Sequence, residues 1–404
     1  MIPRVKRNCR LRLLHSDSHS DHFRMDNLAH SLVGLTSAKA GLDRLSPYAT
    51  TVCVISANAA DADFVSLLGD RWTLLQYHRG ITHSLVGTIA IGVLIPVFAY
   101  VIERIVSSIR KCAPRIRLRG LLLASMVAAV THPLMDWTNN YGVRPLLPWS
   151  GRWFYGDLVF IVDPYIWLTL GALAFLMTSN SRWKLFGWSV IGLIATLVVV
   201  AASLQSGPEA GAVKIALVVW IIGLLCTIGL RVFGAQRRVG QRTAMTALAV
   251  VMIYWMGLGF AHHAAAADTL SIANSIAAPH NERVIRAATM PTEANPFRWQ
   301  SVAETDVAIY KFAVSVMNER PDINNGAVTR FEKPAGQEAQ LVSVAERDRR
   351  AQALLGFARF PLARANTDNC IGQALVQFAD LRYTEPGRGR GNFSVNIPVD
   401  CPNR

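Results

Sequence analysis

Long apolar runs alternate with short polar segments through the first two thirds of the chain. Six runs approach the roughly 20 residues that a membrane-spanning helix needs. They lie at about 85–105, 118–135, 158–177, 185–204, 213–232 and 243–260. Two shorter apolar segments, at about 25–40 and 48–60, precede them. The pattern predicts a mostly α-helical, polytopic membrane domain with six spans and two short N-terminal helices.

The last third of the chain has a different pattern. Residues 264–404 contain no apolar run of spanning length, only short stretches such as 308–317 and 341–345 separated by prolines and glycines. We predict a small soluble α+β domain there. The resulting division is a basic disordered extension at 1–24, a membrane domain at 25–262 and a soluble C-terminal domain at 263–404. Either Met1 or Met25 is the true start.

Composition supports a membrane protein. The mean hydropathy is +0.27 and the formal net charge is +14. Most lysines and arginines lie between the apolar runs, so we interpret them as topology signals and predict membrane lipids, not nucleic acid, as partners. Because basic loops stay in the cytoplasm, the loops near 110–119, 182–184 and 231–242 predict a periplasmic C-terminal domain. A basic tail before Met25 conflicts with this orientation, and the alternative is a site that faces the cytoplasm.

The six cysteines are scattered and form no C-x-x-C pair, which excludes a thiolate zinc site or a redox motif of that kind. Only Cys370 and Cys401 share the polar C-terminal region. We expect them to form a disulfide if that region lies in an oxidising compartment.

The segment His78-Arg79-Gly80-Ile81-Thr82-His83-Ser84 precedes the first clear span. Two histidines five positions apart do not share one face of a continuous helix, so Gly80 is expected to provide a turn between them. Thr82 or Ser84 then caps the helix that follows. Histidine is the commonest metal ligand, which makes this segment the first candidate for chemistry.

Further histidines and carboxylates lie at the boundaries of apolar segments. Asp26 with His30, and His132 with Asp136, are four apart and so lie on one helical turn. The full candidate set is Asp26, His30, Asp61, Asp63, His78, His83, His132 and Asp136. Mixed imidazole and carboxylate ligands suit zinc, manganese or iron(II) better than calcium. A site with up to eight ligands has room for two or more ions, which would activate water for a phosphoester displacement.

Other functions remain open for the same residues. Paired polar groups can simply lock helices together, in which case replacing His83 or Asp136 by alanine destabilises the fold without changing metal content. A metal-binding transport or regulatory protein would instead place its ligands near the middle of spans. Here they lie at span ends, which favours an enzyme, with Asp63 or Asp136 as general base if that residue is not a direct ligand. The substrate, the number of ions and the oligomeric state stay open.

An aromatic stretch with charged neighbours follows the second clear span. Trp153-Phe154-Tyr155 is typical of an interfacial belt. We expect four charged residues around it to position ligands or contact an anionic substrate. These are Arg144, Arg152, Asp157 and Asp163.

The motifs M-D-N-L-A-H-S, D-A-D, H-R-G-I-T-H-S, H-P-L-M-D-W and R-W-F-Y-G-D resemble the YdjM-like family of bacterial inner-membrane, metal-dependent hydrolases, over roughly 25–170. The resemblance implies an inner-membrane location and a divalent ion, with zinc favoured. It also implies a phosphoester or lipid-linked substrate, because the family is similar to zinc-dependent phospholipases C. Two features depart from the family: Ala60 replaces a proline, and 24 residues precede Met25. The implied metal positions are His30, Asp61, Asp63, His78, His83, His132 and Asp136.

Overall fold

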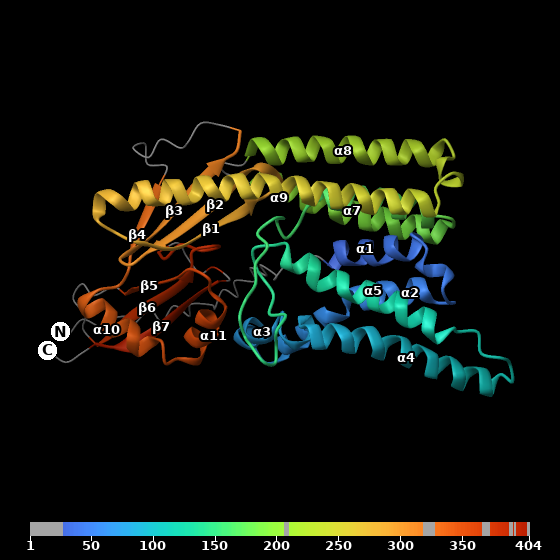
Figure 1. Cartoon of the computed structure of the whole chain (residues 1–404), viewed down its shortest axis with the longest axis horizontal. Helices are drawn as coiled ribbons and strands as arrows, with labels where there is room; N and C mark the ends of the chain where they lie inside the picture. Colours follow the sequence, from blue (N-terminus) through green and yellow to red (C-terminus); the bar gives the residue numbers. More distant parts are fainter. Residues whose placement is uncertain are drawn as a thin grey trace, which may run out of the picture.

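Figure 1 shows a bundle of long helices with a smaller domain of sheets and short helices at one end. The computed structural model describes residues 27–205, 210–317, 328–365, 372–387, 391 and 393–401. The predicted basic extension 1–24 and Asp26 lie outside the described residues. The predicted fold class, a helical membrane domain with an α+β C-terminal domain, is confirmed.

The bundle consists of long helices joined by short connections at its two ends. Its helices are α1 (Asn27–Lys39), α2 (Ala49–Asn58), α4 (Leu85–Ile109), α5 (Leu118–Trp137), α6 (Pro164–Thr178), α7 (Arg182–Gln205), α8 (Ala210–Val232) and α9 (Gln241–Ala277). Three short elements connect α2 to α4: the 3₁₀ segment η2 (Ala59–Leu68), helix α3 (Arg71–Tyr77) and the 3₁₀ turn η3 (Ile81–His83).

Six helical segments among the described residues are long and apolar enough to cross a membrane. They are Ala49–Leu68, Leu85–Ile109, Leu118–Trp137, Arg182–Leu204, Gly211–Val232 and Gln241–His280. The number of spans agrees with the prediction, but two of the segments counted as spans differ. The predicted short helix at 48–60 continues through η2 into a segment of 20 residues, whereas the predicted span 158–177 is the shorter α6.

The late start of α6 has a local cause. Asp163 is extended, and its Oδ1 accepts hydrogen bonds from the backbone nitrogens of Tyr165 and Ile166, so it caps a helix that begins at Pro164. Leu158 instead donates its backbone N–H to the carbonyl of Thr138. The apolar residues before Asp163 therefore belong to a loop that packs on the end of α5.

The outer faces of the bundle are apolar. Phe98 on α4 and Phe186 on α7 are 68% and 64% exposed, and Leu225 on α8 is 63% exposed. Such a continuous apolar exterior is stable in contact with lipid and not with water. The exterior therefore fits the membrane location predicted from the sequence.

Basic loops gather at the end of the bundle away from the C-terminal domain (Figure 1). Arg117, before α5, donates to the carbonyl of Arg44 in the α1–α2 loop. Arg231, at the end of α8, donates to Ser179 after α6. Gln241, at the start of α9, donates to the carbonyl of Ala40. These contacts place the α1–α2, α4–α5, α6–α7 and α8–α9 loops at one end.

The C-terminal domain contains two antiparallel sheets. The first has the order β1 (Val284–Thr292), β2 (Asn295–Thr305), β3 (Ala308–Ser315) and β4 (Val328–Glu332); the second is β5 (Pro361–Ala365), β6 (Gln373–Asp380) and β7 (Ser394–Asp400). Helices α10 (Gly336–Ala345) and α11 (Arg349–Phe357) pack on the second sheet. Helix α9 continues past 260, and its last turns pack on Trp299 and Tyr310 of the first sheet. The predicted boundary at 262/263 therefore falls within one helix.

The C-terminal domain also holds the loop that follows α5. Tyr141 from this loop packs in the same apolar cluster as Phe357 of α11. Buried Arg382 donates to the carbonyl of Asn140 at 2.7 Å, and Arg359 pairs with Asp157 at 2.7 Å. The domain therefore braces the segment that leads away from Asp136.

The structure bears on the predicted disulfide only for Cys401. Cys53, Cys112 and Cys226 are free, and Cys401 is disulfide-bonded. Because Cys370 lies outside the described residues, the pairing of Cys370 with Cys401 stays a prediction.

Candidate metal centre

The structure gathers the seven residues that the sequence pointed to as ligands at the end of the bundle nearest the C-terminal domain. They come from five elements, because helix ends and short turns meet there. The residues are His30 of α1, Asp61 and Asp63 of η2, His78 at the end of α3, His83 of η3, and His132 and Asp136 of α5. All four histidines are almost completely buried.

The segment 78–84 folds as a tight turn because of its small and polar residues. A Cβ on Gly80 would lie 2.4 Å from the carbonyl oxygen of Tyr77, so only glycine fits. The Ser84 hydroxyl accepts a hydrogen bond from the backbone N–H of Gly87 and caps α4, which begins at Leu85. Of the two predicted caps, Ser84 is the one used. The turn directs His83 inward.

Four ligand atoms form one compact group: Asp61 Oδ1, His83 Nε2, His132 Nε2 and Asp136 Oδ2. His83 Nε2 lies 3.4 Å from Asp61 Oδ1 and 3.2 Å from Asp136 Oδ2. His132 Nε2 lies 3.5 Å and 3.4 Å from the same two oxygens. Four atoms around one ion at bond lengths of about 2.0–2.2 Å would be roughly 3.3–3.6 Å apart in a tetrahedron. The spacing fits a small divalent cation.

Hydrogen bonds to the other ring nitrogens orient both imidazoles. His132 Nδ1 lies 2.6 Å from the carbonyl oxygen of Ala57, which can only accept, so Nδ1 carries the proton. His83 Nδ1 makes its hydrogen bond with Thr82 Oγ1 at 3.0 Å. That hydroxyl donates its own proton to Asp63 Oδ2, which lies 3.2 Å from Nδ1, so Nδ1 carries a proton and donates. These are the outer contacts that usually fix the tautomer of a metal-binding histidine. In its neutral form, each ring then has its lone pair on Nε2.

The two Nε2 atoms of His83 and His132 face each other at 3.1 Å. Two lone pairs at this distance repel unless a proton or a cation lies between them. Asp136 Oδ2, beside them, is a buried carboxylate oxygen without a hydrogen-bond partner. Burial lowers the pKa of His83, but the nearby carboxylates of Asp136, Asp61 and Asp63 outweigh burial and raise the pKa to about 10. The cluster is therefore built to hold positive charge.

A second group of ligand atoms comes from Asp61, Asp63 and His78. Asp61 belongs to both groups and is the only one of these residues positioned to bridge two ions. Asp63 is already engaged: its Oδ1 contacts His78 Nδ1 at 2.9 Å, and its Oδ2 accepts from Thr82 and from the backbone N–H of Arg79. His30 lies outside both groups, 3.5 Å from Asp136 Oδ1 and stacked on His132.

Arg79 is a site residue that the sequence analysis missed. It is 6% exposed, and its Nη2 lies 2.7 Å from Asp136 Oδ1. Its Nη1 donates to the carbonyls of Asp136 and Gly142 and to the side chain of Asn139. The signal was present, since Arg79 lies between the two histidines of the most specific motif. It was passed over because arginines are usually exposed.

The other charged candidates lie outside the ligand cluster. Arg144 donates to the carbonyls of Gln76 and His78 and so holds the backbone of the histidine segment. Exposed Arg152 lies over Phe154, and Asp157 pairs with Arg359. Asp163 caps α6 and accepts a hydrogen bond from the hydroxyl of Tyr254 on α9. Each of the four thus makes a contact within the described part of the chain, and a role toward a substrate stays a prediction.

The membrane-spanning bundle and its buried acid and histidine cluster define a polytopic membrane protein with a candidate metal centre. Residues 25–207 match the YdjM inner membrane protein family, which confirms the predicted resemblance for that part of the chain. The uncharacterized protein YfhP of Bacillus subtilis (strain 168) is 27% identical over 161 residues, which cover 37% of this chain and 46% of that protein. The chain thus spans less than half of this relative. No solved structure matches significantly.

Proposed function

We propose that the protein is a membrane-bound, metal-dependent hydrolase that cleaves a phosphoester. The observation that carries this proposal is the pair of facing Nε2 atoms, His83 and His132, flanked by carboxylate oxygens of Asp61 and Asp136. Zinc is the favoured ion, since it takes nitrogen and oxygen ligands tetrahedrally at about 2.0–2.2 Å. Calcium, with bonds of about 2.3–2.6 Å to oxygen ligands, fits less well. Manganese and iron are the other candidates.

Within this proposal His83, His132, Asp61 and Asp136 hold the ion, and Asp63 with His78 offers a second position. When bound, such ions supply Lewis acidity that lowers the pKa of water and stabilises the oxygens of a phosphoester displacement. Asp63 and the carbonyl of Ala57 keep the imidazoles of His83 and His132 in the tautomer that presents Nε2. Arg79 balances the charge of Asp136 in a buried environment.

Asp63 and Asp136 were the two predicted general bases. Both oxygens of Asp63 are engaged in hydrogen bonds, so Asp63 is better suited to orienting His78 and His83 than to moving a proton. Asp136 keeps Oδ2 free of hydrogen bonds. We therefore favour Asp136 as the base for an ion at the second position, because Asp136 is not one of the ligands there.

The alternative is a metal-binding membrane protein without catalysis, with a transport or regulatory role. One observation favours it: four protein ligands complete the coordination of a structural zinc ion, whereas catalytic zinc usually has three and an open position. The second group answers this objection, because its three side chains leave a position open. Hydrolysis therefore depends on the ion at Asp61, Asp63 and His78, or on a fifth ligand at the first group.

Replacing Asp61 by asparagine tests the proposal. We expect hydrolysis of p-nitrophenyl phosphate mono- and diesters by the zinc-loaded wild type to fall at least about 100-fold, because Asp61 serves both ligand groups and even outer partners of a metal contribute 10–100-fold. Asp43→Asn is the control, since Asp43 pairs with Lys39 near the opposite end of the bundle. A wild type that binds zinc stoichiometrically but cleaves no ester would replace the hydrolase by the non-catalytic alternative.

We also infer that the protein resides in the bacterial inner membrane with its metal centre and C-terminal domain in the periplasm. Lysines and arginines of the α1–α2, α4–α5 and α8–α9 loops and of the start of α7 lie at the opposite end of the bundle, and such basic segments stay in the cytoplasm. Lipids then surround the bundle, and the substrate reaches the site from the membrane or the periplasm.

Cys112 gives a direct test of this orientation. It is exposed in the α4–α5 loop at the basic end. In intact spheroplasts we expect a membrane-impermeant maleimide to leave it unlabelled, and permeabilisation to expose it. Labelling of Cys112 is measured as the difference between the wild type and the Cys112→Ser variant. Of the other free cysteines described, Cys226 lies within α8 and Cys53 is buried. Labelling of Cys112 before permeabilisation would invert the topology.

A further inference from the structure

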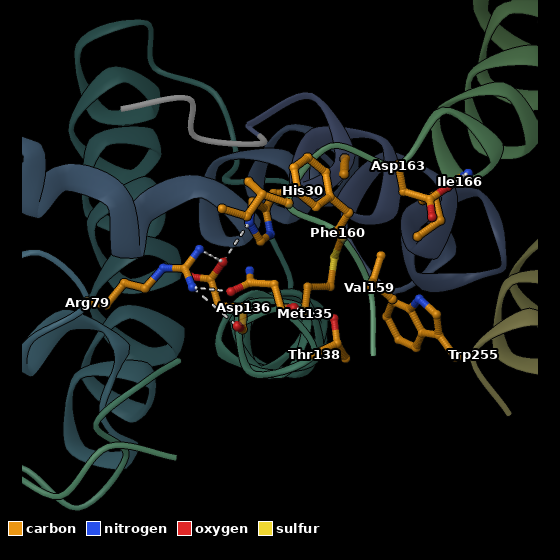
Figure 2. Close-up of a pocket in the computed structure, with 13 residues that line it drawn as sticks. His30, Arg79, Met135, Asp136, Thr138, Val159, Phe160, Asp163, Ile166 and Trp255 are labelled. Carbon is orange, nitrogen blue, oxygen red and sulfur yellow. Dashed lines mark hydrogen bonds and ion pairs between the residues drawn. The ribbon is translucent and has the colours of Figure 1, made fainter. Parts of the chain in front are cut away.

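A small cavity extends from the metal cluster toward α6 and α9 (Figure 2). His30, Arg79 and Asp136 line one side, and Asp163, Ile166 and Trp255 line the other. Its volume is about 30 Å³, which is room for two or three waters at roughly 10–15 Å³ each. The cavity can accept a small polar group and not a whole ligand.

The lining contains polar atoms that have no partner. Arg79 Nε, His30 Nδ1, Trp255 Nε1 and Asp136 Oδ2 are all buried and make no hydrogen bond. Buried polar atoms are paired in the great majority of cases, and an unpaired one costs free energy. Four such atoms around one cavity therefore indicate a ligand that pairs with them. Asp136 Oδ2 already faces the metal position, so the other three remain.

Two of the three remaining atoms are donors and favour an acceptor. The Nε of arginine and the indole nitrogen of tryptophan can only donate. His30 Nε2 faces Asp136 Oδ1 at 3.5 Å, so the ring proton lies on Nε2 and Nδ1 is an acceptor. The other two nitrogens of Arg79 are used by Asp136, Asn139 and Gly142, so Nε is the part of the guanidinium left for a ligand. These two donors belong to α9 and to the histidine segment, on opposite sides of the cavity that both residues line (Figure 2). An oxyanion, with several acceptor oxygens, matches them.

Asp163 is the one carboxylate on the far side of the cavity, and its oxygens are occupied. Oδ1 accepts from the backbone nitrogens of Tyr165 and Ile166, and Oδ2 accepts from the hydroxyl of Tyr254. Burial also raises the pKa of this carboxyl. Asp163 therefore does not prevent an anion from binding near Arg79.

The remaining wall is apolar. Val159, Phe160 and Ile161 come from the loop before α6, and Ile166 from its first turn. The ring of Trp255 closes the α9 side (Figure 2). A ligand that places an oxyanion beside Arg79 thus meets apolar surface where it leaves the cavity, which selects an amphipathic molecule over a fully polar one.

We propose that this cavity binds the phosphoryl oxygens of an amphipathic phosphoester, with Trp255 as a specificity-determining residue that donates its indole N–H to one of them. This inference rests on the proposed function only in calling the ligand a substrate; binding of the phosphoryl group does not depend on hydrolysis. Trp255 lies outside residues 25–207, so this contact is not part of the region that matches the family.

The test is equilibrium dialysis of the full-length protein with radiolabelled inorganic phosphate, with its metal and after chelation. Trp255→Phe keeps a ring of similar shape and removes the donor. We expect it to weaken phosphate binding by about tenfold or more in both states, since hydrogen bonds to charged groups are the stronger ones. Trp188→Phe is the matched control, because the Trp188 indole lines a different apolar cavity and already donates to Thr178.

The outcomes separate the two proposals. Phosphate binding that depends on Trp255, in a protein that cleaves no ester, supports the cavity and sinks the hydrolase. Ester cleavage with the same KM in wild type and Trp255→Phe sustains the hydrolase and overturns the cavity. Wild-type protein that binds no phosphate in either state, or equal losses in the Trp188 and Trp255 variants, also overturns it.

Discussion

Replacing His83 by alanine is expected to abolish stoichiometric metal binding, with the dissociation constant for zinc rising by more than about 100-fold. Outer partners of metal ligands already contribute 10–100-fold, and His83 would bind the ion directly. His83 supplies Nε2 to the four-atom group, and Asp63 on its other nitrogen fixes its orientation. Elemental mass spectrometry of the purified protein in detergent measures the metal, with a chelator titration for affinity.

His263→Ala is the control for this experiment. His263 is an exposed histidine on α9 and belongs to neither ligand group. We expect it to leave metal content unchanged. Asp136→Ala should behave like His83→Ala. If His83→Ala lowers thermal stability while the metal content of wild type and variant stays equally low, the cluster only locks helices together and the metal centre does not exist.

The helices of the membrane domain followed from the sequence because lipid requires long apolar segments with internally satisfied backbones. The errors came at helix ends. Asp163 and Pro164 are a strong start signal, yet the apolar residues before them were counted into the same span. The extension of α9 to Ala277 was missed for the opposite reason. Its last turns pack on the C-terminal domain and not in lipid, so their sequence lost the apolar pattern.

The ligand cluster followed from residue types at segment boundaries, but its internal geometry did not. Spacing in the sequence predicted that His132 and Asp136 lie on one turn, and their side chains are 3.4 Å apart. It carried no information on which atoms share an ion, because Asp61 and His83 meet only through the fold. Trp255 had no signal at all, because it lies in an apolar run and is one of ten tryptophans in the chain.

The C-terminal domain was the part of the fold that the sequence predicted least well. Its contacts with the loop beside the metal centre were not predicted at all. Arg382 was not singled out, since nothing in the local pattern distinguishes it from other arginines. In the fold the whole residue is 4% exposed. Its guanidinium carbon lies among aromatic rings, 4.6 Å from the ring centre of Phe357. Its donation to the carbonyl of Asn140 connects this domain to the loop whose Asn139 holds Arg79. Such a connection across domains is visible only in three dimensions.

Arg382→Met is therefore expected to destabilise the protein by about 3–5 kcal/mol, because it leaves Asp380 as a buried charge without its partner. Both side chains of the pair are 0% exposed, with 2.7 Å between Arg382 Nη2 and Asp380 Oδ2. Thermal and denaturant unfolding of the purified protein in detergent measure the loss. We also expect weaker zinc binding, since Asn139 is released from its support.

The chain offers a matched control for this pair. Arg350 and Asp348 have the same two-residue spacing and a similar contact of 2.9 Å, but their side chains are 41% and 29% exposed. Surface pairs contribute about 0–1 kcal/mol, so Arg350→Met should change little. The double variant Arg382→Met with Asp380→Leu should recover much of the loss, because no buried charge remains. Equal effects of Arg382→Met and Arg350→Met would mean that burial of the Asp380 pair does not anchor the C-terminal domain on the metal centre.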